Sequence, residues 1–112
     1  MLTFPKALRL CRKKEITQIF AEGQFYKSGP YRFKWTLGES APVRTVISIS
    51  KRVGSSPVRN RLKRLVRESL RHSPDLKSRS MNLAIFITHP LQQPPKQQDV
   101  QRHIERFFAQ LD

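Results

Sequence analysis

The chain has 112 residues, of which 22 are Lys or Arg and 8 are Asp or Glu, so its formal charge at neutral pH is +14. This length indicates a single domain, residues 1–112, with one modest hydrophobic core. Its apolar runs fall well short of the roughly 18 residues needed to cross a bilayer. The N-terminal segment has neither the apolar run nor the small-residue cleavage site of a secretory signal. We therefore expect a cytoplasmic protein without a membrane partner.

The excess of positive charge indicates what the protein binds. A charge of this size opposes a compact fold through self-repulsion. It is usually retained where the partner is a polyanion. Nucleic acid is the first candidate, and an anionic membrane surface is the second. Metal chemistry has little support, because Cys11 is the only cysteine and His72, His89 and His103 lack ligand spacing. The composition therefore predicts nucleic-acid binding and no metal site.

The chain begins with a predicted basic arm, residues 1–12, and a short helix. The candidate anchors of the arm are Phe4, Leu8 and Leu10. A helix is predicted over about 13–22, where apolar residues recur at i, i+3 and i+4: Ile16, Ile19 and Phe20. Gly23 suits the left-handed position that often ends a helix.

Two strands follow, with a weaker candidate before them. Residues 31–37, "YRFKWTL", alternate strictly between apolar and polar side chains, which predicts a strand with one buried face. Residues 44–50, "RTVISIS", are β-branched and predict a second strand, buried on both faces. A turn separates the two at 38–42, and a further short strand is a weaker prediction over 24–30.

A basic helix is the most distinctive element. Ser56 is a suitable N-cap and Pro57 a suitable first helical residue, and Pro74 sets the latest end. Five apolar residues form a stripe covering an arc of about 140°. They are Val58, Leu62, Leu65, Val66 and Leu70.

The side of this helix opposite the stripe carries charge of one sign. Its residues are Asn60, Arg61, Lys63, Arg64, Arg67 and Arg71. Like charges four residues apart are mildly destabilising, and Arg64–Glu68 is the one favourable pair at that spacing. A phosphate backbone would neutralise this surface and release counterions.

Arg59 falls inside the apolar arc, beside Val66, where an unpaired charge is costly. It lies in the first turn, so we expect its side chain to leave past the helix end and join Lys51 and Arg52. The free N–H groups of the same helix end form a natural anion site. The junction therefore predicts anion binding.

An apolar run at 81–90 predicts a central strand, "LQQPPKQQ" a linker, and residues 98–111 a final helix. The apolar face of that helix comprises Val100, Ile104, Phe107, Phe108 and Leu111. The order is α-β-β-β-α-β-α if the weaker strand forms. This order predicts an α+β fold, a two-layer sandwich of one sheet with helices packed on it.

The segment "ISKRVGSSPVRNRLKRLVRES" resembles the signature of the protein subunit of bacterial ribonuclease P, and "RLCRKKEITQIFAEG" resembles the first helix of that family. The resemblance implies a left-handed strand–helix–strand crossover, against the right-handed rule. Three positions depart from the family pattern. Ile16 replaces an aromatic residue, Val46 a glycine, and Asn82 an acid.

The resemblance also implies a function. The family's holoenzyme is an endoribonuclease that removes the 5′ leader of precursor tRNA, and its catalytic RNA subunit performs the hydrolysis with magnesium. The implied contacts to that RNA are Arg59, Asn60, Arg61, Lys63, Arg64 and Arg67. The implied cleft for the single-stranded leader contains Ile16, Phe20, Lys34, Trp35, Lys51 and Arg52. No catalytic residue, bound metal or protein partner is implied for this chain. For Phe20 and Trp35, core packing is the alternative to stacking on bases.

Two other functions fit parts of the sequence. A general basic ribosomal or RNA-chaperone protein would explain the charge but not the loop–helix motif. A protein-only nuclease would have to use His72, His89 or His103, none of which lies in a motif.

Overall fold

The computed structural model describes residues 9, 12–38 and 41–111. The predicted arm of residues 1–12 therefore lies outside the described residues except for Arg9 and Arg12, and its three candidate anchors are not described. Arg9 forms an isolated parallel bridge with Thr45.

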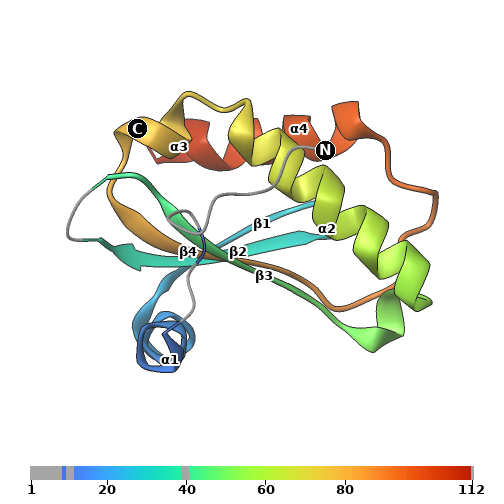
Figure 1. Ribbon diagram of the computed structural model, residues 1–112, viewed down its shortest axis with the longest axis horizontal. Helices are drawn as coiled ribbons and strands as arrows, with labels where there is room; N and C mark the ends of the chain where they lie inside the picture. The colour runs from blue at the N-terminus through green and yellow to red at the C-terminus, as the bar shows by residue number, and fades with distance from the viewer. Residues whose placement is uncertain (1–8, 10–11, 39–40, 112) are drawn as a thin grey trace.

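The main helices and strands follow the predicted order α-β-β-β-α-β-α, including the weaker strand, and form two layers (Figure 1). They are α1 (Lys13–Glu22), β1 (Gln24–Ser28), β2 (Tyr31–Leu37), β3 (Arg44–Ile49), the 3₁₀ turn η2 (Lys51–Val53), α2 (Ser56–Arg71), α3 (Asp75–Ser78), β4 (Met81–Ile87) and α4 (Gln97–Gln110). The short elements η2 and α3 are additions to the prediction. The α+β class is confirmed.

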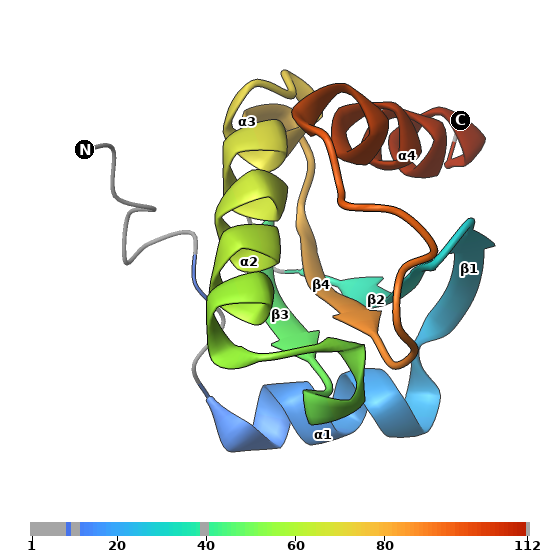
Figure 2. The ribbon, with the colours of Figure 1, turned by 90° about the vertical axis from the view of Figure 1, so that its right-hand side faces the viewer.

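The sheet has the strand order β1-β2-β4-β3, in which β4 lies between β2 and β3. β3 and β4 are parallel, and the other neighbours are antiparallel. The α2 helix therefore makes a crossover between adjacent parallel strands. In Figure 2, α2 lies on the viewer's side, both strands run downward, and β4 lies to the right of β3. This crossover is left-handed, as the resemblance implies.

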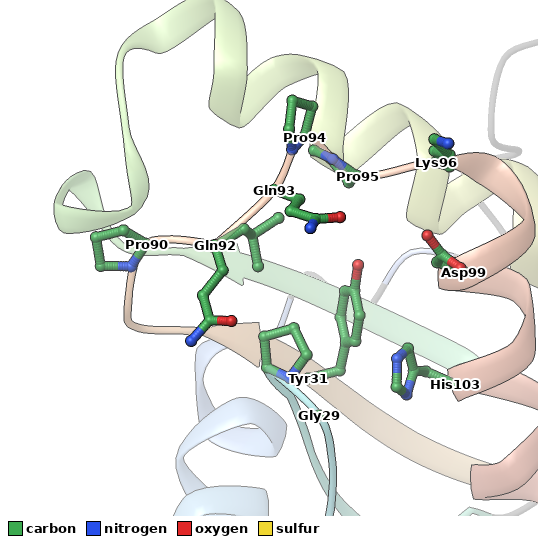
Figure 3. A pocket seen from close by; sticks show the side chains of 12 residues that line it. Gly29, Tyr31, Pro90, Gln92, Gln93, Pro94, Pro95, Lys96, Asp99 and His103 are labelled. Atoms are coloured by element: carbon green, nitrogen blue, oxygen red, sulfur yellow. The ribbon is translucent and has the colours of Figure 1, made fainter.

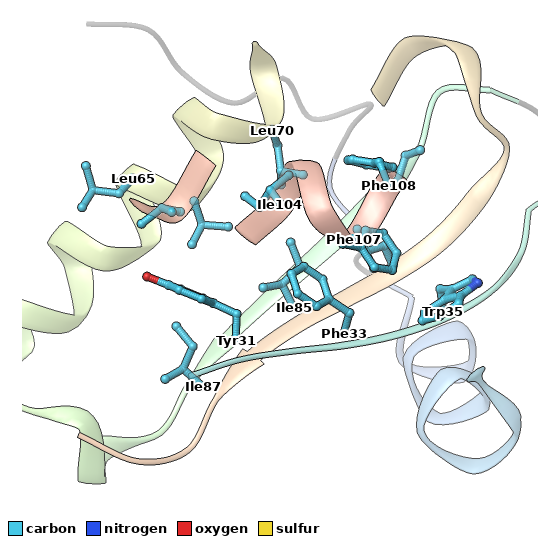
Figure 4. Close-up of a cluster of buried hydrophobic side chains, with 14 of the residues drawn as sticks. Tyr31, Phe33, Trp35, Leu65, Leu70, Ile85, Ile87, Ile104, Phe107 and Phe108 are labelled. Atoms are coloured by element: carbon cyan, nitrogen blue, oxygen red, sulfur yellow. The ribbon is translucent and has the colours of Figure 1, made fainter. Parts of the chain in front are cut away.

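One face of the sheet forms the core. Three of the four odd-numbered residues of β2 (Tyr31, Phe33 and Trp35) are buried on this face, as the alternation predicts, whereas Leu37 at the end of the strand is 88% exposed. Phe33 stacks on Phe107 of α4 with ring centroids 4.5 Å apart, and Trp35 meets the same ring edge-on at 5.0 Å. Figure 4 shows these rings between the sheet and the two helices.

The apolar stripe of α2 packs on this core, with one exception. Four of its members are buried: Leu62, Leu65, Val66 and Leu70. Val58 is 42% exposed, so the prediction that it anchors the helix is wrong. It lies in the first turn, beyond the part of α2 that faces the sheet. Gln97 ties α4 to α2 by donating to Ser69 Oγ at 2.6 Å.

Three local predictions are corrected. Gly23 has φ −68°, not a left-handed φ, and glycine is needed because a Cβ would meet the Ile19 carbonyl oxygen at 2.3 Å. The N-cap of α2 is Ser55 rather than Ser56. β3 is buried mainly on one face, since Ser48 is exposed.

Replacing Val66 with Asp should unfold the domain. Val66 is fully buried under α2, so the variant places an unpaired charge in the core. We expect a loss of at least about 4 kcal/mol in the free energy of unfolding, measured by urea titration with circular dichroism. Arg64→Asp, at an exposed position of the same helix, is the control and should stay folded. A cooperative transition at the wild-type midpoint for Val66→Asp would contradict the packing.

Candidate nucleic-acid interface

The outer side of α2 presents a surface of positive charge, which we call the α2 face. It consists of Asn60, Arg61, Lys63, Arg64 and Arg67. Asn60, Arg61 and Arg64 are exposed, whereas Lys63 and Arg67 are half-buried. The face follows from the stripe, because burying one side of an amphipathic helix turns the other side to solvent.

The positive charge of Arg61 and Arg64 on the α2 face is not compensated by acidic side chains within the described residues. The predicted Arg64–Glu68 pair is wrong: Glu68 contacts Arg71 at 3.5 Å and His72 at 3.7 Å. Both partners lie toward the C-terminal end of α2, so Glu68 is drawn away from Arg64. Among the described residues, no ion pair involves Arg61 or Arg64. Both guanidinium groups can therefore meet an external anion.

Arg59 leaves the apolar arc past the helix end, as predicted, but makes different contacts. Its Nε donates to the Gly54 carbonyl at 3.2 Å, and its Nη2 donates to Ser56 Oγ at 3.0 Å. Lys51 and Arg52 are exposed in η2, where the Arg52 N–H donates to Ser50 Oγ at 3.2 Å. Lys51, Arg52 and Arg59 thus all lie around the β3–α2 junction.

A second surface lies on the opposite face of the sheet, where α1 packs. Ile19 is buried against Ala84, with Ile16 and Val46 packed around them. Glu15 fixes the start of α1 through two polar contacts. Arg44 donates to its carboxylate at 3.2 Å, and Asn82 donates to it at 3.3 Å.

Three aromatic rings and one cation lie together beside α1, on what we call the α1 face: Phe20, Phe25, Lys34 and Phe86. Phe20 is 42% exposed, and its ring lies 5.5 Å from that of Phe86. Phe25 is 53% exposed and lies 6.5 Å from the same ring. Lys34 donates to the Phe20 carbonyl at 3.1 Å, and its Nζ lies 5.7 Å from the Phe20 ring centroid. Such a surface suits stacking on unpaired bases.

Trp35 does not belong to this face, so the prediction that it lines a leader cleft is wrong. It is 6% exposed and packs on Phe107, on the other side of the sheet. The reason is the strand period, since Lys34 and Trp35 are neighbours and must point to opposite faces. The core-packing alternative is the observed one.

Phe25 and Phe86 were missed as members of the α1 face. Phe25 pairs with Lys34 across β1 and β2, and Phe86 pairs with Arg32 across β4 and β2. The alternation of β2 identified Lys34 as facing outward. Placing the two phenylalanines on this face requires the register between the strands, which the sequence did not provide.

Among the residues that the structure describes, no group of three or more His, Cys, Asp or Glu side chains could hold a metal ion. Within the same residues, no helix is long and apolar enough to span a bilayer.

The sequence model of the Ribonuclease P family matches residues 4–112. This chain belongs to that family. The ribonuclease P protein component of Geotalea uraniireducens is 38% identical over 68 residues, covering 61% of this chain and 60% of the relative. That of Dictyoglomus turgidum is 40% identical over 76 residues, covering 66% and 63%. The matched part is thus less than two thirds of these relatives.

Two solved structures share the fold. The ribonuclease P protein of Thermotoga maritima has a TM-score of 0.78 at 18% identity, with 93% of this chain and 97% of that chain covered. The Staphylococcus aureus protein has a TM-score of 0.75 at 20% identity, with 96% and 97% covered. At these identities the likeness establishes the architecture.

The three departures from the ribonuclease P pattern lie together under α1. Ile16 and Val46 pack on the same small cluster, and Asn82 bonds to Glu15. An aliphatic pair thus occupies the two positions at which the resemblance implies an aromatic residue and a glycine. The aromatic contribution to the α1 face comes instead from Phe20, Phe25 and Phe86.

Replacing Arg61 or Arg64 with Ala should weaken binding to a structured RNA and reduce the slope of log affinity against log salt by about one phosphate contact each. Filter binding across a salt series measures both quantities. Arg106→Ala, an exposed arginine of α4 outside the α2 face, is the matched control. Unchanged slopes for both α2 variants would contradict the phosphate-facing assignment.

Glu15 and Arg44 should be coupled in stability, because their side chains are only 23% and 33% exposed. We expect a coupling of about 0.5–1 kcal/mol in a double-mutant cycle measured by urea unfolding. The control cycle pairs Glu15 with Arg12, which is 79% exposed at 3.9 Å and should show almost no coupling. Equal couplings in the two cycles would mean that Arg44 does not hold α1.

Proposed function

We propose that this protein is the RNA-binding subunit of a ribonuclease P that removes 5′ leaders from precursor tRNA. The observation that carries the proposal is the α2 face, five residues of one helix without an acidic side chain among them. Family membership supports a ribonuclease P RNA as the structured partner for this face. The proposal places the protein in the cytoplasm with that RNA.

The α1 face is the proposed site for the single-stranded leader. Stacking on aromatic rings tolerates any base, and flanking cations neutralise the phosphates. Phe20 and Lys34 supply both features within one contact, at 5.7 Å. Ile16 contributes aliphatic contact, while Lys51 and Arg52 extend the positive charge toward the α2 face.

The chemistry is assigned to the RNA subunit. Magnesium would supply the activated water and charge neutralisation for phosphodiester hydrolysis. The donor groups in the described part of this chain do not gather into a site for it, so the proposal gives the RNA most of the metal binding. The role left to this chain is to bind and orient RNA by charge and stacking.

Cleavage of precursor tRNA at low magnesium tests the proposal, using the cognate RNA subunit with and without the protein. We expect stimulation by the protein and tighter binding of precursor than of mature tRNA. A general RNA chaperone would bind both alike. Absence of stimulation would overturn the proposal.

Replacing Phe20 with Ala should weaken binding of precursor tRNA by at least fivefold, because stacking contributes about 1–3 kcal/mol per base. Affinity for mature tRNA and for the RNA subunit should be unchanged. The measurement compares precursor and mature tRNA in the reconstituted holoenzyme. Leu37→Ala, a similar truncation at an 88% exposed position on β2, is the control. An equal loss for both tRNAs would remove Phe20 from the leader site.

A further inference from the structure

A cavity of about 540 Å³ lies on the core side of the sheet, away from the α1 face. Its walls are the turn between β1 and β2, the segment of residues 90–96, and the first half of α4. We call it the hairpin–α4 pocket. This volume is within the range of small-ligand sites.

Tyr31 supplies an unused polar group to this pocket. The residue is 3% exposed overall and lines the pocket, and none of the hydrogen bonds found among the described residues involves its hydroxyl. Figure 3 shows the hydroxyl pointing into the hollow on the side of Asp99, with the His103 ring beside the lower part of the tyrosine side chain. Because the hydroxyl opens into the cavity and has no protein partner within the described part of the chain, it is available to hydrogen-bond a ligand there.

His103 and Asp99 complete a set of hydrogen-bonding groups. The His103 ring lies 5.0 Å from the Tyr31 ring, and its Nδ1 is 2.7 Å from Ser28 Oγ, which leaves Nε2 for another partner. Asp99 adds an acceptor at the rim, where Arg102 contacts it at 2.5 Å.

Tyr31 and His103 are uncharged, whereas Lys96 and Asp99 contribute one charge of each sign to the lining. Burial, assisted by Asp99, raises the pKa of Tyr31 to about 12, so the hydroxyl keeps its proton at neutral pH. Burial, followed by Arg106 and Arg102, lowers the pKa of His103, so its imidazole is uncharged. A free phosphate would find no buried cation here and would meet the Asp99 carboxylate.

The other lining residues include the polar side chains of Gln92, Gln93 and Lys96, and four of the lining residues are prolines. They are Pro30, Pro90, Pro94 and Pro95. Proline rings on the walls and neutral donors and acceptors at the base suit a planar heteroaromatic ring that has its own edge donors and acceptors.

The pocket adjoins a second hollow that reaches the α2 face. A second hollow, of about 380 Å³, shares residues 91–95 with it and reaches Val58 and Arg61. Arg61 Nη2 also donates to the Pro95 carbonyl at 3.5 Å. A strand whose phosphates contact the α2 face would therefore have unpaired bases within reach of the pocket.

We propose that the hairpin–α4 pocket binds one unpaired nucleobase of the RNA held by the α2 face, with Tyr31, His103 and Asp99 as its hydrogen-bonding groups. This inference rests on the proposed function for its RNA partner. It adds a base contact to a surface that otherwise recognises only phosphates. It also assigns a function to the exposed Val58, which lies on the path between the two sites.

The test compares Tyr31→Phe with wild type in binding the cognate RNA subunit across a salt series. We expect affinity to fall about threefold to tenfold, the effect of one hydrogen bond, with an unchanged salt slope because no phosphate contact is lost. Tyr26→Phe removes the same hydroxyl from a half-buried tyrosine outside the pocket and should bind as wild type. Thermal melting should show both variants folded.

An unchanged affinity for Tyr31→Phe, with wild type still binding the RNA and stimulating cleavage, would overturn this inference alone. Loss of wild-type binding or stimulation would instead remove the proposed function. The His103 imidazole signals in NMR, followed on adding AMP, GMP, CMP and UMP, distinguish the source of the base. Saturable shifts with these nucleotides and an unchanged RNA affinity for Tyr31→Phe would assign the pocket to a free nucleotide and overturn the RNA contact.

Discussion

The stacking of Phe107 on Phe33 decides which face of the sheet is buried, and the positions of both candidate RNA surfaces follow from it. With Phe33 facing α4, the period of a strand turns Lys34 to the opposite face, beside α1. The same core holds Leu62 and Val66 of α2 and so directs the arginines of that helix to solvent. The α1 face and the α2 face are thus two consequences of one packing arrangement.

The two faces lie on opposite sides of the sheet and are joined at one end by the β3–α2 junction. Lys51 and Arg52 occupy this junction, and Arg59 bonds back into it through Gly54. Positive charge therefore continues around the edge of the sheet from one face to the other. A partner that is large and anionic can contact both faces.

The base of α1 shows how one chain of the Ribonuclease P family maintains a shared fold with different residues. The small cluster under α1 is aliphatic, with Ile16 and Val46, and Asn82 donates to Glu15. Aromatic surface is instead spread toward β1 by Phe25 and over β4 by Phe86. The position of α1 thus depends on a polar clamp at its start and aliphatic packing at its centre, and its exposed aromatic contact lies toward its end.

The sequence alone determined what depends on local periodicity and composition. The alternation in β2, the stripe of α2 and the charge of +14 require only neighbouring residues, and the loop–helix motif was specific enough to indicate the family. The tertiary structure decided what depends on distant pairing. It placed Trp35 in the core, gave Glu68 to Arg71 rather than Arg64, and left Val58 at the surface. It also brought together Phe25 with Phe86 and Tyr31 with His103, residues far apart in the chain. Strand register and helix docking set these contacts, and both are properties of the whole packed domain rather than of any segment.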